Sequence, residues 1–578
     1  TSHWREVASL ASRAEQLALG VPQDIEWALD QNDTLWLLQS RPITAVRELD
    51  VHAPKGIWTR KIADDLWADR LTPFLADAML TNAPRYDLSR YARLLGVQST
   101  SSSLVVINGY LYVSCEALKQ VLQLIPKRFR TGDLRALFPP GFEAAVPSPS
   151  MLKIASSLFR CAVLPLIEPK ANLLVCQSIT LHMIAKLKNR LQKIKPGRTD
   201  ETREQKLDNI RDAVELMACL QDLNQWPYSY ATIFTWLLRW MVVDVGGLQH
   251  KDFLQLLSEG GSNVTVEIES ELGRIAAIIR QNEQIKQLFS GMSQDELYNA
   301  LPPVIQNELT CFLNRFGVRS RNRTLYVKRW AEAPEQVLGM LALLVKEPVN
   351  KSKTASRRLK STADRLLWPV RLLFRPVCRQ AGKYLDLREE LRFFLDEILY
   401  VIRRSLLDLG KDMGLGSKAM FLTLAELTDV VSGRMSIEEA RSLSDRRLED
   451  FNEDCEPYTY YIDGRPSNEL FSRSGIIRGV GTSSGKASGY ARIVEDPSRS
   501  DLKKGDILVA KSTDPGWTPV LSIIGGIVAE EGGLLNHCSI VARELGIPAV
   551  VGVREATRRI REGSYITIDG DLGVVQTE

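Results

Sequence analysis

The sequence predicts a multidomain α and α/β protein. A large, mainly α-helical central domain is expected between an N-terminal β-hairpin and a small C-terminal α/β domain. The chain has 578 residues, more than one hydrophobic core normally organises. Apolar residues recur at helical spacing from about residue 55 to residue 465. Short β-rich runs separated by glycines follow, which is typical of a compact unit of about 100 residues.

Residues 1–46 are predicted to be the last part of a larger domain. An amphipathic helix comes first, and the strands "DIEWALD" and "TLWLLQS" then flank a turn at Asn32 and Asp33. Two strands do not form a stable sheet alone. We therefore expect the rest of this domain to precede Thr1 or to be supplied by another chain.

The central domain is predicted over residues 47–465. Stretches such as residues 387–410 place apolar residues at i, i+3, i+4 and i+7, with charges on the opposite face. A β insertion is expected at residues 103–114. Residues 456–476 are rich in turn formers and are predicted to act as a hinge to a domain at residues 466–578.

Composition indicates a cytosolic protein without a nucleic-acid or membrane partner. The 74 basic and 70 acidic residues give a net charge of only +4. The eight cysteines are scattered singly, with no metal-ligand spacing, as expected in a reducing compartment. The longest apolar run, residues 337–345, is about half of the roughly 20 residues that cross a bilayer.

His537 is the strongest candidate for a catalytic residue. Gly532 and Gly533 follow an apolar strand, and Asn536 is a plausible N-cap of the helix "NHCSIVAREL". His537 would then lie at the positive end of that helix, where phosphate binds well, and Arg543 could reach the same oxyanions. Neutral imidazole is a competent nucleophile near pH 7. The alternative is a structural histidine at a helix start.

The motifs around His537 resemble the mobile phosphohistidine domain of the phosphoenolpyruvate-utilising enzymes. They are "GTSSGKASGYARIV", "GDILVAKSTDPGWTPVL", "GGIVAEEGGLLNHCSIVARELGIPAVVGV" and "ITIDGDLGVV", in this order over residues 475–578. The family includes pyruvate phosphate dikinase, phosphoenolpyruvate synthase and rifampicin phosphotransferase. The resemblance implies a small β/β/α swivelling domain, in which ATP phosphorylates His537 and the domain carries the phosphoryl group to a second site. Leu535 and Asn536 stand where the family usually has Thr or Ser.

The N-terminal hairpin resembles the C-terminal edge of the ATP-grasp nucleotide-binding domain of the same family. The resemblance implies that Glu26 and Gln39 contact Mg²⁺ or phosphate and that Arg41 clamps the transferring phosphoryl group. Oxygen ligands suit a hard cation, and a guanidinium fits phosphate bidentately. ATP and Mg²⁺ are therefore the expected cofactors. The alternative is an edge hairpin with ordinary surface residues.

The central domain resembles the acceptor domain of rifampicin phosphotransferases. There an Arg-Glu-x-x-Lys helix segment lies by the acceptor hydroxyl, and the matching residues are Arg388, Glu389 and Arg392. Positions i and i+4 put the two arginines on one helical face, where they could neutralise a phosphoryl group while Glu389 takes the hydroxyl proton. The alternative is a solvated charged face.

Three further residues are candidates for substrate binding. Arg319 follows Val318, where the family often has a histidine. Trp236 and Trp240 would share a helical face and could form the wall of a pocket for a large apolar acceptor. The alternative is that these two tryptophans, at helical spacing, belong to an ordinary hydrophobic core.

The leading hypothesis is a dikinase-type phosphotransferase. It would move the β-phosphoryl group of ATP through His537 to a small-molecule acceptor, with AMP and phosphate as the other products. One alternative is an ATP-dependent condensing enzyme like the prodigiosin-forming ligases, in which phosphorylation activates a carbonyl. Another is a non-catalytic phosphoacceptor subunit or a truncated fragment that needs a separate ATP-grasp chain.

Overall fold

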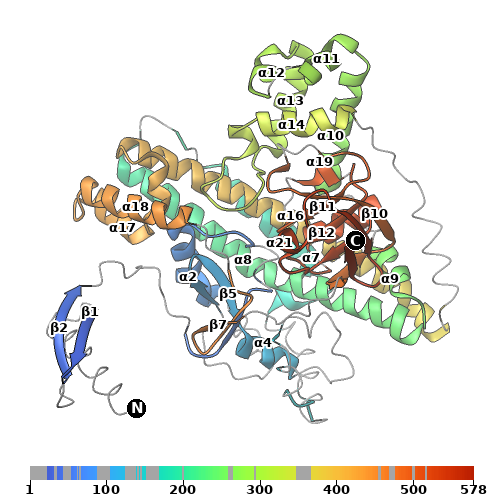
Figure 1. The fold of residues 1–578 in the computed structure, drawn as a ribbon. Coiled ribbons are helices and arrows are strands. Elements are labelled where there is room, and N and C mark those ends of the chain that lie inside the picture. Colours follow the sequence, from blue (N-terminus) through green and yellow to red (C-terminus); the bar gives the residue numbers. More distant parts are fainter. Residues whose placement is uncertain are drawn as a thin grey trace. The chain divides into compact units, whose positions relative to one another are not determined.

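A computed structural model of the chain divides it into two compact units, residues 1–54 and residues 55–578 (Figure 1). The structure describes residues 23–30, 35–42, 54–61, 63, 67–86, 104–123, 138–139, 142, 146–150, 156, 160, 168–194, 196–197, 201–257, 264–291, 294–346, 366, 368–453, 457–467, 476–497, 502–513, 517–521, 523–534 and 536–577. Among these, no helix is long and apolar enough to cross a lipid bilayer.

The first unit contains the predicted hairpin. Strands β1 (Gln23–Leu29) and β2 (Leu35–Pro42) pair antiparallel, with a register shift between Glu26 and Trp27. The Trp36 indole N–H donates to the Asp30 carboxylate at 2.9 Å. The helix predicted before these strands lies outside the described residues.

Two long helices form the spine of the second unit. Helices α8 (Arg203–Arg239) and α16 (Trp368–Asp412) pack against each other along their length (Figure 1). Lys206 on α8 pairs with Asp408 and Asp412 near the C-terminal end of α16, at 3.2 and 2.5 Å. Farther along, the ring of Tyr384 on α16 lies 5.1 Å from that of Tyr230 on α8. The two helices therefore run antiparallel.

Shorter helices surround these two long helices, and others form a separate bundle. They are α2 (Pro73–Tyr86), α4 (Cys115–Leu122), α7 (Cys176–Leu191), α9 (His250–Leu257), α17 (Leu424–Val431) and α18 (Ile437–Asn452) around the spine. The bundle consists of α10 (Val264–Arg280), α11 (Glu283–Gly291), α12 (Gln294–Ala300), α13 (Pro303–Phe316) and α14 (Glu335–Lys346). The apolar core of the bundle is continuous with one face of the C-terminal domain.

A five-stranded sheet brings together distant parts of the chain. Its order is β4-β5-β3-β6-β7, with β3 (Ile57–Thr59), β4 (Leu104–Ile107), β5 (Tyr110–Ser114), β6 (Tyr460–Ile462) and β7 (Arg465–Ser467). The insertion predicted at residues 103–114 is confirmed as a hairpin. Within the segment predicted as a hinge, β6 pairs with β3 and β7 pairs with β6.

The C-terminal domain is built on one eight-stranded sheet. Its order is β8-β15-β14-β10-β11-β12-β13-β9. The four adjacent strands β10, β11, β12 and β13 run parallel to one another. The strands are β8 (Ile476–Arg478), β9 (Val480–Ser483), β10 (Lys486–Ile493), β11 (Ile507–Ala510), β12 (Gly526–Ala529), β13 (Ala549–Val551), β14 (Tyr565–Asp569) and β15 (Val574–Thr577). Helices α19 (Thr518–Leu521), α20 (His537–Leu545) and α21 (Ala556–Arg559) connect them.

Candidate functional site

His537 is the first residue of helix α20, as the sequence predicted. Asn536 caps the helix, because its side-chain oxygen accepts a hydrogen bond from the Ser539 backbone N–H at 3.0 Å. The Ser539 hydroxyl donates to the Gly533 carbonyl at 2.7 Å and ties the helix start to the preceding loop. The side chain of His537 lies outside the described part of the structure.

Gly532 is required by the geometry of this loop. Its φ is +124°, a conformation that residues with a side chain rarely adopt. A Cβ at this position would also lie 2.3 Å from the Asn536 Nδ2 atom. The glycine therefore allows the N-cap side chain to fold back over the loop that leads to His537.

Arg543 lies on the same helix and is buried. Its guanidinium donates to the Thr482 carbonyl at 3.1 Å, and its Nε has no hydrogen-bond partner in the described structure. Burial is the main cause that lowers the pKa of Arg543 to about 10, and the positive charge of Arg388 adds to this effect. Helix α9 packs against both α16 and α20, so the predicted acceptor helix and the predicted histidine helix lie in the same part of the molecule.

The segment of α16 predicted to serve the acceptor is buried rather than a solvated face. Arg388, Glu389 and Arg392 are 2%, 1% and 5% exposed. The Arg388 guanidinium lies over the ring of Tyr228 on α8, 5.2 Å from its centroid. One carboxylate oxygen of Glu389 is 3.5 Å from the Arg392 guanidinium, and the other has no hydrogen-bond partner among the described residues. Glu389 thus retains an unused acceptor.

Arg319 lies beside this segment, in a network of buried charges. It forms an ion pair with Asp396, whose other oxygen is 2.8 Å from the Arg323 Nε. Burial by itself would raise the pKa of Asp396, but the charges of the surrounding arginines outweigh it and hold that pKa below its usual value. Burial is also the main cause that lowers the pKa of Arg319, and Glu389 opposes this shift.

The network continues to two more arginines. Arg403 donates to Glu332 at 2.7 Å and to the Leu325 carbonyl at 2.5 Å. Arg329 donates to the Asn322 carbonyl at 2.7 Å, and burial lowers its pKa to about 10. We call the six buried arginines of this region the arginine cluster: Arg319, Arg323, Arg329, Arg388, Arg392 and Arg403.

The arginine cluster is rich in positive charge. Among the described residues between 319 and 403, only two acidic side chains, Glu389 and Asp396, are buried to the same degree. The Nε and one Nη atom of Arg319 and the Nε of Arg329 donate no hydrogen bond within the described structure. Because buried charges are costly unless paired, this arrangement is suited to hold an anion.

The backbone register gives the positions of the three predicted residues in the N-terminal hairpin. Glu26 and Gln39 are directly opposite each other, and Arg41 pairs with Asp24 two positions along. Two oxygen-bearing residues at one register position suit a hard cation such as Mg²⁺. Gln39 is exposed, whereas the side chains of Glu26 and Arg41 lie outside the described part.

The two predicted tryptophans lie in different surroundings. Trp236 is half-buried and packs against the central core. Trp240 is 39% exposed and begins the π-helical turn η5 (Trp240–Val245). Two aromatic residues that the sequence analysis did not select lie against the arginine cluster: Tyr228 beside Arg388 and Phe393 beside Arg319, with 4.9 Å between the Arg319 guanidinium and the centroid of the Phe393 ring.

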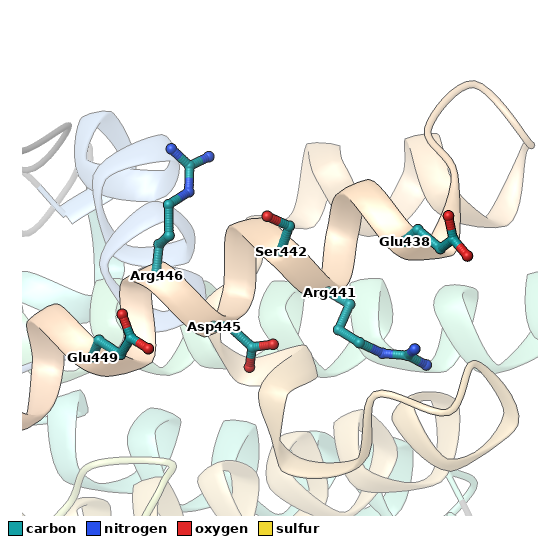
Figure 2. A pocket seen from close by; sticks show the side chains of 6 residues that line it. All are labelled: Glu438, Arg441, Ser442, Asp445, Arg446 and Glu449. Atoms are coloured by element: carbon teal, nitrogen blue, oxygen red, sulfur yellow. The ribbon is translucent and has the colours of Figure 1, made fainter. Parts of the chain in front are cut away.

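A surface hollow of about 380 Å³ lies elsewhere, on α18 (Figure 2). Its lining consists of Glu438, Arg441, Ser442, Asp445, Arg446 and Glu449. These side chains project from a single helix, so the hollow is a charged helix surface and shares no residue with the predicted site. Within the described part of the chain, no cluster of three or more His, Cys, Asp or Glu residues could hold a metal ion.

Comparison with known domain families identifies three segments. Residues 2–60 match the AMP/ATP-binding domain of pyruvate phosphate dikinase. Residues 225–389 match the fourth domain of rifampicin phosphotransferase, and residues 502–573 match the mobile domain of PEP-utilising enzymes.

Curated relatives match different shares of this chain. A rifampicin phosphotransferase from Streptomyces sviceus is 28% identical over 56% of this chain and 41% of its own length. The prodigiosin synthesizing transferase PigC from Serratia marcescens is 24% identical over 99% of this chain and 70% of its own. A phosphoenolpyruvate synthase from Aeropyrum pernix is 48% identical, over 17% of this chain and 12% of its own.

The chain thus spans less than half of the first of these relatives. The high identity to the synthase is confined to 103 residues. Three segments of this chain are thus similar to domains of phosphoenolpyruvate-utilising enzymes and of rifampicin phosphotransferase.

Proposed function

We propose that this chain carries the acceptor site and the phosphohistidine of a phosphotransferase. His537 would receive the β-phosphoryl group of ATP from a nucleotide-binding domain that includes the N-terminal hairpin. The C-terminal domain would then deliver the group to a small molecule bound at the arginine cluster. ATP and Mg²⁺ are the proposed cofactors, with Glu26 and Gln39 at the metal and Arg41 at the phosphates.

The observation that carries this proposal is the buried excess of guanidinium groups next to the histidine helix. Arg388 belongs to the arginine cluster, and its charge reaches Arg543 on α20. A phosphoryl group on His537 brings negative charge to this region, where the arginines can stabilise it. Helices that only pack against each other do not require an excess of buried positive charge, because unpaired buried charges are costly.

The transfer step uses groups on α16. The bond between the histidine nitrogen and phosphorus breaks as the acceptor hydroxyl oxygen bonds to phosphorus. Glu389 would accept the hydroxyl proton with its unused oxygen, and Arg388 and Arg392 would neutralise the phosphoryl oxygens. Because both Arg388 and Arg543 are buried, the acceptor would enter while the two domains are apart.

The proposal can be tested on this chain with a chemical phosphate donor. Potassium phosphoramidate phosphorylates histidine without a nucleotide-binding domain, and mass spectrometry of peptides would locate the phosphohistidine. We expect His537 to be labelled and then discharged by a hydroxylated acceptor from a panel, with a phosphoester as product. The exposed His182 on α7 is the matched control, since its label should persist. Equal persistence of both labels with every acceptor would contradict the proposal.

A condensing reaction is the alternative, because the match to PigC extends over 99% of this chain. In that case phosphorylation would activate a carbonyl oxygen, and a second substrate would displace the phosphate. The two reactions differ in their products. A stable phosphoester supports phosphotransfer, whereas a joined product with release of inorganic phosphate supports condensation.

A further inference from the structure

Large apolar side chains are exposed where helix α8 ends. Ile233, Leu237 and Trp240 are 50%, 36% and 39% exposed. Their spacing of i, i+4 and i+7 puts them on one face, since η5 continues the helix from Trp240. Scattered apolar side chains are common on protein surfaces, but a contiguous group of them usually marks a binding surface.

The beginning of α16 adds to the same group. Trp368, Leu372 and Leu373 are 76%, 68% and 63% exposed. Because the two helices run antiparallel, the beginning of α16 lies beside the end of α8 (Figure 1). A Cβ on Gly246, directly after η5, would lie only 2.5 Å from a methyl group of Leu366, just before α16. We call this group of six exposed side chains the apolar tip: Ile233, Leu237, Trp240, Trp368, Leu372 and Leu373.

Basic side chains continue the exposed face of α16 beyond the apolar tip. Arg375 and Arg379 follow Trp368 at i+7 and i+11, so they lie on its side of the helix. These two arginines and Lys383 are exposed, and none of the three forms an ion pair within the described part of the chain. Residues 368–383 contain no Asp or Glu. This end of α16 therefore presents positive charge next to apolar surface.

Neighbouring residues do not offset this charge. Asp244 on η5 lies 3.5 Å from the Arg239 guanidinium, so its charge is already balanced. In the sequence shortly before α16, residues 351–365 contain six basic residues and one acidic residue. The net charge of +4 is a sum over the whole chain and conceals this local excess. The expectation of no membrane partner depended on that sum.

We propose that the apolar tip and the basic residues beside it bind the surface of a membrane that contains anionic phospholipids. Trp and Leu side chains enter the boundary between headgroups and acyl chains, and arginine and lysine side chains pair with the lipid phosphates. None of these residues belongs to the proposed transfer site, so the inference goes beyond the proposed function and does not depend on it.

Other occupants fit only half of this surface. A nucleic acid would pair with the basic residues but leave the exposed leucines in water. A second copy of the chain could cover the apolar tip, but it would bring the same basic residues and place like charges near each other. A bilayer with anionic headgroups supplies both the apolar interior and the negative charge.

Flotation with lipid vesicles tests the proposal on the whole chain, without ATP or an acceptor. One set of vesicles would contain phosphatidylcholine and phosphatidylglycerol in equal parts, and the other phosphatidylcholine alone. We expect the chain to float with the anionic vesicles and to stay largely in solution with the neutral ones. Added salt should weaken the binding, because the charge contribution is screened.

The apolar variant combines Trp368→Gln, Leu372→Gln and Leu373→Gln. Its partition coefficient for the anionic vesicles should fall at least about tenfold, because three side chains no longer leave water on binding. Val304→Gln with Leu572→Gln is the matched control, since these two side chains are 62% and 70% exposed in other parts of the chain. The control should float like the native chain. Circular dichroism would confirm that both variants are folded.

The basic variant combines Arg375→Gln, Arg379→Gln and Lys383→Gln. It should also lose at least about tenfold in partition coefficient, and its remaining binding should respond less to salt. A matched control removes three exposed lysines outside this surface and should keep most of the binding: Lys328, Lys503 and Lys504, each to Gln.

Failure of the native chain to float with anionic vesicles would overturn the proposal, as would native flotation of the folded apolar variant. Binding of a fluorescent oligonucleotide without flotation would assign the basic residues to a nucleic acid instead. A dimer in light scattering that the apolar variant loses, again without flotation, would assign the apolar tip to a second copy. Either result would also overturn the membrane proposal.

Discussion

Asp396→Asn is the substitution that most directly tests the buried charge network. Asp396 accepts from Arg319 and, at 2.8 Å, from Arg323, and all three side chains are at most 8% exposed. An asparagine keeps the shape but removes the negative charge that pairs with both guanidinium groups. Removing one partner of a buried ion pair costs about 3–5 kcal/mol, because the remaining charges stay buried without compensation.

The same substitution at an exposed ion pair is the matched control. Asp445 lies 2.5 Å from the Lys418 ammonium, but the two side chains are 40% and 37% exposed. Exposed pairs contribute about 0–1 kcal/mol, so Asp445→Asn should change the stability little. Urea unfolding followed by circular dichroism would measure both variants against the native chain.

The effect of Asp396→Asn should depend on pH in a defined direction. The pKa of Asp396 is lower in the folded chain than its usual value of about 3.9, so its charge stabilises the fold above that value. This contribution should be complete at neutral pH and disappear as the pH falls through the lower folded pKa. A destabilisation of less than about 1 kcal/mol at pH 7, equal to that of the control, would refute the reasoning.

Three further predictions concern the loop and helix at His537. Asn536→Ala should destabilise the chain by about 1 kcal/mol in urea unfolding, because the Ser539 N–H loses its acceptor. Gly532→Ala should destabilise it by more than about 1 kcal/mol, because a Cβ would lie 2.3 Å from the Asn536 amide and φ is +124°. Burial raises the pKa of the Cys538 thiol to about 11, so iodoacetamide at pH 8 should alkylate the exposed Cys311 and spare Cys538, as peptide mass spectrometry can check.

Local patterns predicted the elements around His537 well. The Asn536 N-cap and the helix that follows it are where the sequence placed them, and Gly546 ends the helix with φ +70°. These features depend on residues only a few positions apart, so capping preferences and apolar spacing are sufficient. The same holds for the hairpin at residues 103–114, whose turn is Asn108-Gly109 with positive φ at both.

Contacts between distant residues could not be predicted in this way. The short strand β6 pairs with β3, about 400 positions earlier in the chain, and residues 460–467 therefore looked like a linker. Arg319 and Asp396 are also far apart in the sequence, and the pattern on α16 alone gives Asp396 no special role. A charge on an amphipathic helix is usually solvated, so only the packing of the loop after α13 against α16 reveals the arginine cluster.

The excess positive charge of the arginine cluster bears on how the C-terminal domain docks for phosphoryl transfer. The arginine cluster contains more buried positive than negative charges, so the binding of an anion lowers its electrostatic free energy. A phosphorylated C-terminal domain should therefore dock more tightly than an unphosphorylated one, since only the loaded domain brings the charge that the cluster lacks. Added salt should reduce this gain in docking free energy less than it reduces the contribution of the exposed Arg321–Asp496 pair. The reason is that buried charges are screened less than exposed ones.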